Sequence, residues 1–134
     1  MESNCIFCKI IAGQIPCAKV YEDDQVLAFL DINPVSKGHV LIVPKSHHSM
    51  MVDTPDQLVG EVFIKAKTLM KTIKRALEAD FVMVSVVGIE VPHFHVHLIP
   101  RYYNDGLANG YPTQKYGEGE MDQYVSKIIS QLEL

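Results

Sequence analysis

A chain of 134 residues is long enough to bury a hydrophobic core and short enough to form one domain, so we expect a single domain over residues 1–134. Its hydrophobic content of 48% and charged content of 21% are typical of a globular protein, and a net charge of −4 argues against a nucleic acid or an anionic membrane as partner. The sequence shows neither a basic leader nor an apolar run of membrane-spanning length, so we expect a cytoplasmic protein.

The first half of the chain predicts short strands. Residues 18–23 and 25–32 form two candidate strands, and residues 39–44 are a β-branched run that ends at Pro44. Between them, residues 33–38 contain Asn-Pro and a glycine, which is typical of a loop.

One long helix is predicted after these strands. Thr54 is a candidate N-cap, and Gln57 completes a capping box with it. Apolar residues then recur at helical spacing to about Ala79. These residues are Leu58, Val62, Ala66, Leu69, Ile73 and Leu77.

Two more strands are predicted at residues 81–87 and 93–99. Consecutive strands with short connections favour antiparallel pairing, so the expected class is α+β with a five-stranded antiparallel sheet. Residues 101–120 lack periodicity, and a loop of that length is either mobile or part of a site or interface. A short C-terminal helix is expected from an apolar stripe made by Met121, Val125, Ile128 and Leu132.

Three of the six histidines alternate with apolar residues in VPHFHVHLIP, residues 91–100. Side chains alternate between the two faces of a strand, so His93, His95 and His97 should share one face, spaced about 6.6–7 Å apart at their Cα atoms. The opposite face should pack against the long helix. Three interpretations are possible: a polar surface, a metal site made by all three histidines, or nucleophilic catalysis by a neutral imidazole at phosphorus.

A second chemical motif is the pair Cys5-x-x-Cys8 near the N-terminus. Three cysteines are too few for a disulfide scaffold, so this pair suggests a metal site or a redox site. The alternative is two buried thiols. Cys17 is most simply a small apolar residue, and His39 is given no role.

Together these motifs resemble the histidine triad (HIT) family of nucleotide hydrolases and transferases. HFHVHLIP has the family's alternating signature, and CIFCKIIAGQIPCAKVYEDDQVLAFLDINPVSKGHVLIVPKSH, residues 5–47, is similar to its N-terminal half. The resemblance spans about residues 5–101 and leaves residues 102–134 as a variable segment. It implies a five-stranded antiparallel sheet with one long and one short helix, and a homodimer.

The resemblance also assigns roles. His95 matches the histidine that becomes nucleotidylated, His97 matches the histidine that assists at the phosphate, and Asp31 matches the carboxylate that binds the ribose hydroxyls. The positions that match the nucleobase sandwich are Ile6, Phe7, Phe29 and Ile32, for which plain core packing is the alternative.

Two positions depart from the commoner family pattern. Ser85 stands where an asparagine often contacts phosphate, and Glu90 stands where a hydroxyl often assists the leaving group. We include both among the nucleotide-binding candidates, and their identities leave the natural substrate open.

Zinc-containing relatives imply a structural zinc held by Cys5, Cys8, His47 and His93, with His48 as the neighbouring alternative to His47. Four protein ligands would leave no position for an activated water.

The leading hypothesis is an enzyme that cleaves the α-phosphate of purine nucleotide conjugates, either nucleoside phosphoramidates or dinucleoside polyphosphates, through a nucleotidyl-histidine. A metallohydrolase with a three-histidine catalytic zinc is one alternative. A low-turnover nucleotide-binding or scaffold protein is another.

Overall fold

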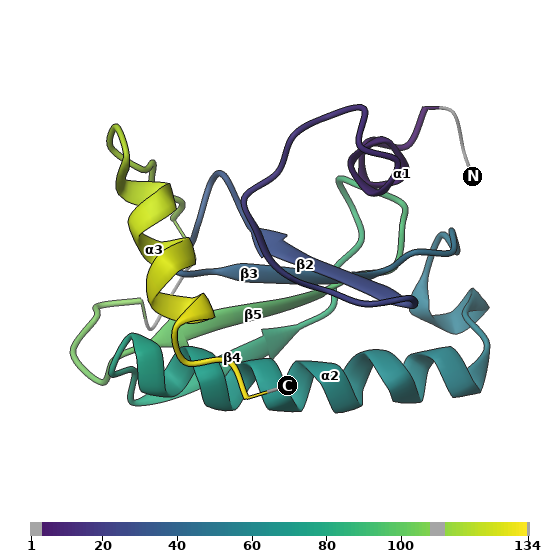
Figure 1. Ribbon diagram of the computed structural model, residues 1–134. Coiled ribbons are helices and arrows are strands. Elements are labelled where there is room, and N and C mark those ends of the chain that lie inside the picture. Colours follow the sequence, from purple (N-terminus) through teal and green to yellow (C-terminus); the bar gives the residue numbers. More distant parts are fainter. Residues whose placement is uncertain (1–3, 108–111, 134) are drawn as a thin grey trace.

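Five strands form one antiparallel sheet in the order β1-β2-β3-β5-β4 (Figure 1). The computed structural model describes residues 4–107 and 112–133. The strands are β1 (Lys19–Glu22), β2 (Val26–Leu30), β3 (Val40–Pro44), β4 (Phe81–Ser85) and β5 (Val96–Arg101). All four neighbouring pairs are antiparallel, which confirms the α+β class and the strand count.

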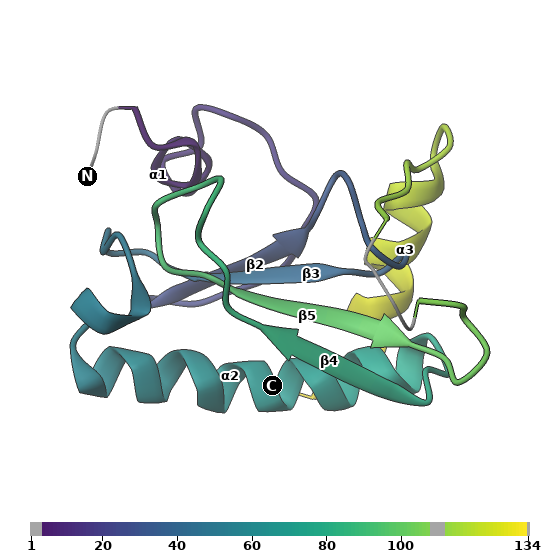
Figure 2. The same cartoon turned by 180° about the vertical axis from the view of Figure 1, so that it is seen from behind.

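Helices cover both faces of this sheet. The long helix α2 (Asp56–Ala76) runs along one face, and the short helix α1 (Ile6–Ile11) lies over the other (Figures 1 and 2). Helix α3 (Glu120–Ile129) stands at one end of the sheet. Among the described helices, none combines the length and apolar character needed to cross a bilayer.

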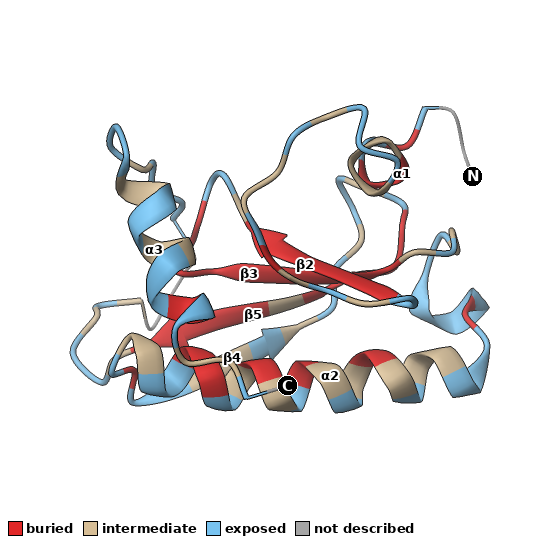
Figure 3. Ribbon diagram, in the orientation of Figure 1, coloured by how far each residue is buried: buried red, intermediate tan, exposed pale blue. Residues whose placement is uncertain are grey.

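The central strands are buried on both faces, and alternate residues enter two separate cores (Figure 3). In β2, Ala28 and Leu30 join the main core with α2, while Leu27 and Phe29 join a smaller core under α1. The alternation follows from the two-residue period of a strand. Phe94, Val96 and Leu98 enter the main core, as the alternation around the histidines predicted.

The predicted start of the long helix is wrong. Helix α2 begins at Asp56, with Pro55 at the N-cap position and no capping side chain. The Thr54 hydroxyl instead donates to the Met50 carbonyl, because Met51–Asp53 form a 3₁₀ turn, η1, that brings this carbonyl within reach at 2.9 Å. The capping box therefore does not form.

The predicted strand 93–99 also begins later, at Val96. Pro92 has no backbone N–H, and the amide of Phe94 donates to the His48 carbonyl instead of to a strand neighbour. His93 and His95 therefore precede β5, although His95 stays on the side opposite the main core. The helix α1 was missed, because it has six residues and its N-cap residue is Cys5 instead of a serine, threonine, aspartate or asparagine.

Candidate active site and metal-binding cluster

Four predicted metal ligands lie together at the end of β3. The ring Nδ1 of His93 lies 3.4 Å from Cys5 Sγ and 3.6 Å from Cys8 Sγ. The His47 Nδ1 lies 3.3 Å from Cys8 Sγ and 3.2 Å from His93 Nδ1. All four ligand atoms fall within 4.8 Å of one another.

These separations fit a tetrahedral zinc. Usual bond lengths to zinc imply about 3.6 Å between a sulfur and a nitrogen ligand and about 3.3 Å between two nitrogens. The four distances given above lie close to these values. Two thiols and two imidazole nitrogens are also the donor set that zinc prefers, so the residues present fit this metal.

A backbone carbonyl orients one of the imidazole ligands. The Nε2 of His93 donates to the Pro44 carbonyl at 2.8 Å, which leaves its Nδ1 lone pair directed at the two sulfurs. His48 points elsewhere, with its ring 3.3 Å from the Ser46 hydroxyl. Within the described residues, His47 and not His48 therefore belongs to the cluster.

The same cluster holds α1 against the sheet. Cys5 is the N-cap residue of α1, and its sulfur accepts the Cys8 amide N–H at 3.4 Å. The turn between them carries Phe7, whose ring meets the His95 ring edge to face at a centroid distance of 4.9 Å. The metal-binding residues therefore also place an aromatic ring beside the central histidine.

His95 uses only its Nδ1 ring nitrogen in a hydrogen bond to another of the described residues, which leaves Nε2 for a ligand. Its Nδ1 donates to the His93 carbonyl at 2.6 Å, because a carbonyl can only accept. Burial lowers the pKa of His95, so the ring is neutral near pH 7 and the lone pair resides on Nε2. A neutral imidazole held in this tautomer is a competent nucleophile.

His97 is held in the opposite tautomer by a residue that the sequence analysis left without a role. The Val35 amide donates to His39 Nδ1 at 3.1 Å, so His39 carries its proton on Nε2 and donates it to His97 Nδ1 at 2.9 Å. Burial lowers the pKa of His39 to about 3 and that of His97 to about 4. The neutral His97 ring therefore carries its hydrogen on Nε2.

Asp31 lies on the same side as these histidines. Its Oδ1 accepts the Asn33 amide at 2.9 Å, and its Oδ2 lies 3.8 Å from His39 Nε2. Burial raises the pKa of Asp31, and the hydrogen bond that it accepts from the Asn33 amide opposes this shift. The Asp31 Oδ2 atom thus remains available to accept a hydrogen bond beside His39.

The proposed nucleobase contacts divide into two pairs. Phe7 and Phe29 are buried and pack edge to face with centroids 5.6 Å apart, as plain core residues also would. Ile6 is 45% exposed and Ile32 is 67% exposed. Both isoleucines therefore leave apolar side-chain surface exposed.

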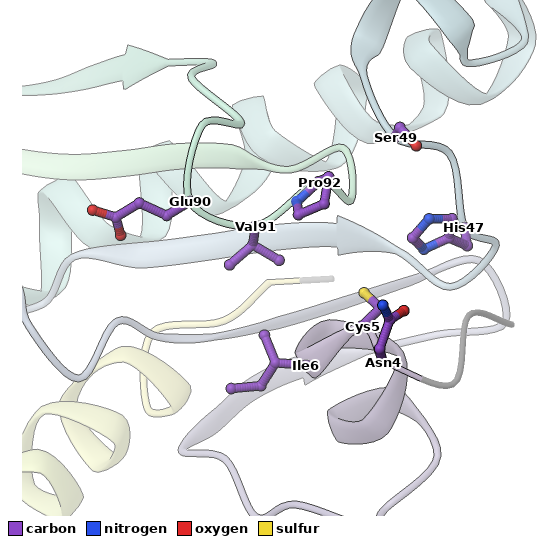
Figure 4. Close-up of a pocket in the computed structure, with 8 residues that line it drawn as sticks. All are labelled: Asn4, Cys5, Ile6, His47, Ser49, Glu90, Val91 and Pro92. Atoms are coloured by element: carbon purple, nitrogen blue, oxygen red, sulfur yellow. The ribbon is translucent and has the colours of Figure 1, made fainter.

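Ser85 and Glu90 occupy different surroundings. Ser85 ends β4 directly opposite His97 in the ladder, whereas Glu90 lies in the exposed loop before β5. Glu90 also lines a hollow of about 470 Å³ in which Ile6 and Val91 lie opposite each other (Figure 4). This hollow is also lined by Cys5 and His47 of the metal-binding cluster.

Comparison with protein families gives a match to the HIT domain over residues 12–104. The chain belongs to the histidine triad family. Curated HIT relatives include an uncharacterized HIT-like protein of Methanocaldococcus jannaschii, 46% identical over 92% of this chain and 98% of that protein. The adenosine 5′-monophosphoramidase of Saccharomyces cerevisiae is 36% identical over 99% of this chain and 85% of its own length. The adenylylsulfatase of Arabidopsis thaliana is 35% identical over 97% of this chain and 68% of its own length.

Solved HIT structures have the same fold. A HIT-like protein from Bartonella henselae gives a TM-score of 0.87 at 31% identity and covers 98% of this chain and 99% of its own. A zinc-bound histidine triad protein from Mycobacterium smegmatis gives a TM-score of 0.84 at 28% identity, over 96% and 94%. These matches take in the C-terminal segment, which the sequence analysis had left outside the resemblance.

Proposed function

We propose that this HIT protein hydrolyses purine nucleotide conjugates at the α-phosphorus through a nucleotidyl intermediate on His95. The supporting observation is the pairing of tautomers: His95 offers a lone pair on Nε2 while His97 offers an N–H on Nε2. A nucleophile beside a hydrogen-bond donor is the arrangement that displacement at phosphorus needs.

The proposed reaction has two balanced steps. In the first, His95 Nε2 bonds to the α-phosphorus and the bond from phosphorus to the leaving group breaks; an amine leaves with a proton taken from solvent, whereas a phosphate leaves as an anion. In the second, water attacks the same phosphorus and gives up one proton to solvent, the bond between phosphorus and His95 breaks, and a nucleoside monophosphate is released. His97 donates to phosphoryl oxygen or to the leaving atom during transfer.

Recognition of the nucleoside is assigned to the neighbouring residues. Asp31 accepts hydrogen bonds from the ribose hydroxyls. The base packs against the apolar surface of Ile6 and Ile32. Phe7 and Phe29 lie behind the base. Ser85 and Glu90 are the candidates for contacts near the phosphate and the leaving group. The yeast and plant relatives, by name a phosphoramidase and an adenylylsulfatase, support an adenosine 5′-phosphoryl conjugate as substrate.

We assign the zinc a structural role, with Cys5, Cys8, His47 and His93 as ligands. Four protein ligands close the coordination sphere, so zinc in this site stabilises the fold without activating water. Reduced thiols of this kind also fit a reducing compartment such as the cytosol.

The three-histidine metallohydrolase has less support. In the described part of the chain, His93 belongs to the cysteine cluster and His97 to a group with Asp31 and His39, while His95 belongs to neither. A single metal shared by all three triad histidines therefore does not match this arrangement.

A homodimer is proposed through the edge strand β4. This strand has only one ladder neighbour, β5, and it exposes Phe81 and Val84, with Val86 and Val87 following it. An unpaired edge with apolar side chains favours association with a second copy. A monomer in light scattering at micromolar concentration would contradict this proposal.

A substrate panel tests the proposed activity. Zinc-loaded protein is mixed with adenosine 5′-phosphoramidate, adenylyl sulfate and a diadenosine polyphosphate, and release of adenosine monophosphate is followed. We expect turnover of at least one conjugate and none of adenosine monophosphate itself. Saturable binding of the monophosphate without turnover of any conjugate would favour the low-turnover binding protein.

A further inference from the structure

The C-terminal segment, residues 112–120, is hydrogen-bonded to the loop that joins β2 to β3, residues 31–39. The backbone N–H of Gln114 donates to the Pro34 carbonyl at 2.7 Å, and its side-chain Nε2 donates to the Val35 carbonyl at 3.0 Å. The Tyr116 hydroxyl accepts the Gly38 amide at 2.9 Å. An ion pair between Lys37 and Glu120, at 2.9 Å, completes these contacts.

One peptide unit of this loop has contacts on both sides. The Pro34 carbonyl and the Val35 N–H belong to the same planar peptide, so they point in opposite directions. The carbonyl accepts from Gln114, and the N–H donates to His39 Nδ1. Gln114 therefore orients the group that sets the proton position on His39.

One backbone hydrogen bond closes the loop, from the Asp31 amide to the His39 carbonyl at 2.9 Å. Residues 31–39 contain no regular helix or strand, although Asn33 donates to Asp31 and His39 donates to the Ser36 carbonyl. The C-terminal segment, in contrast, is anchored in the core. Its Tyr116 ring packs on Tyr124 of α3 at a centroid distance of 5.8 Å.

The loop also packs closely against the end of α2 at Gly38. Gly38 has φ +98°, and a Cβ at this position would lie 2.2 Å from Leu77 Cδ1. The loop therefore approaches the end of α2 closely while Tyr116 holds the Gly38 amide, so that its movement is restricted on two sides.

We infer that Gln114 and Tyr116 are positioning residues for the proposed reaction, because they hold the loop that carries the Val35 amide. This amide keeps the His39 proton on Nε2. His39 in turn keeps His97 in the tautomer that donates from Nε2. This inference rests on the proposed function for its kinetic consequence. If the loop shifts, His39 can carry its proton on Nδ1 and accept at Nε2. His97 then donates from Nδ1 and loses the N–H that faces the phosphate.

A matched pair of glutamines tests this role. Gln114→Ala removes the side-chain bond to the Val35 carbonyl and keeps the backbone bond to the Pro34 carbonyl, so it measures how much the side chain contributes to holding the loop. Adding Tyr116→Phe removes the acceptor for the Gly38 amide. Gln131→Ala is the control, because Gln131 is also in the C-terminal part of the chain but its side chain accepts from Arg75 of α2, away from the loop. All three proteins are prepared with zinc and compared by melting temperature, kcat and KM.

We expect Gln114→Ala to lower kcat about tenfold and the double variant to lower it further, with KM within about twofold of wild type. Gln131→Ala should keep wild-type kcat. Equal kcat in Gln114→Ala and Gln131→Ala would overturn the inference. Because Gln114 is exposed, its variant is expected to fold even where the double variant does not.

Ring ¹⁵N spectra of His97 give a readout that does not depend on turnover. In wild-type protein His97 should show a protonated Nε2 and an unprotonated Nδ1, and Gln114→Ala should shift this population while Gln131→Ala does not. An unchanged His97 tautomer in Gln114→Ala overturns the inference. Lack of wild-type turnover on every conjugate would instead count against the proposed function alone.

Discussion

Two histidine pairs lie close together in this molecule and meet through different atoms. His47 and His93 approach with both Nδ1 atoms, 3.2 Å apart, beside two cysteine sulfurs. His39 and His97 approach through Nε2 and Nδ1, 2.9 Å apart, with one donor and one acceptor. The first geometry suits a metal and the second a hydrogen bond. The ring nitrogen that each histidine offers, and not the residue type, separates the two roles.

His95 lies between these pairs and belongs to neither, so its replacement should have the largest effect. His95→Asn removes the only nucleophile we propose, and turnover should fall by about 10⁴-fold or more while nucleotide binding persists. His48→Asn is the matched control, because His48 is a histidine outside both pairs. Turnover of the folded His95→Asn protein within tenfold of wild type would contradict the nucleophile role.

Breaking the metal-binding pair should change stability. Cys8→Ser removes one ligand, so zinc content should fall well below one per chain and the melting temperature should drop by on the order of 10 °C. Cys17→Ser is the control, because Cys17 is a half-buried cysteine outside the cluster. Full zinc occupancy in the purified Cys8→Ser protein would show that the metal is held elsewhere.

Breaking the hydrogen-bonded pair should change catalysis with little effect on zinc. His39→Phe removes the donor to His97 Nδ1, so kcat should fall by about 10²-fold as His97 loses its defined tautomer. Metal analysis and steady-state kinetics on the same preparation separate the two effects. Loss of zinc in His39→Phe would show that the hydrogen-bonded pair also supports the metal-binding pair. An unchanged kcat would show that His39 does not set the tautomer that His97 uses in catalysis.

A smaller effect is expected at the sugar. Asp31→Asn keeps an oxygen for the Asn33 amide but loses the charge, and charge-assisted bonds contribute about 1.5–3 kcal/mol. Affinity for adenosine monophosphate should fall at least about tenfold, whereas affinity for the 2′,3′-dideoxy form should change little. Titration calorimetry measures both. Equal losses for the two nucleotides would remove Asp31 from the ribose site.

A last effect is expected on stability at acid pH. His39 and His97 have folded-state pKa values of about 3 and about 4, below the ordinary value of 6.5, so the unfolded chain binds more protons from pH 6.5 down to about 3. Their contribution to the free energy of unfolding is complete above pH 6.5 and is lost as pH falls through this window. Urea unfolding of wild type and His39→Phe measures it. If the free energy of unfolding of the two proteins depended on pH in the same way, the low folded-state pKa of His39 would be contradicted.

Local periodicity predicted the sheet and the two longer helices. For the metal-binding cluster the residues alone indicated only the Cys5-x-x-Cys8 pair, and the family resemblance supplied His47 and His93. Neither α1, a short apolar turn capped by a cysteine, nor the late start of β5 after Pro92 was predicted. The role of His39 was also missed. That role depends on the Val35 amide in an irregular loop and on His97, 58 positions away, and no local pattern reports such contacts.

The most direct test of the whole account is to locate the covalent adduct in protein that lacks zinc. Folded Cys8→Ser protein is mixed with adenosine 5′-phosphoramidate for a single turnover, quenched, and mapped by peptide mass analysis. We predict an acid-labile adenylyl group on His95, in an amount close to that found in wild type, because the metal-binding cluster and the phosphate chemistry use different histidines. An adduct on another residue, or no adduct in demonstrably folded Cys8→Ser protein when wild type forms one, would contradict this division.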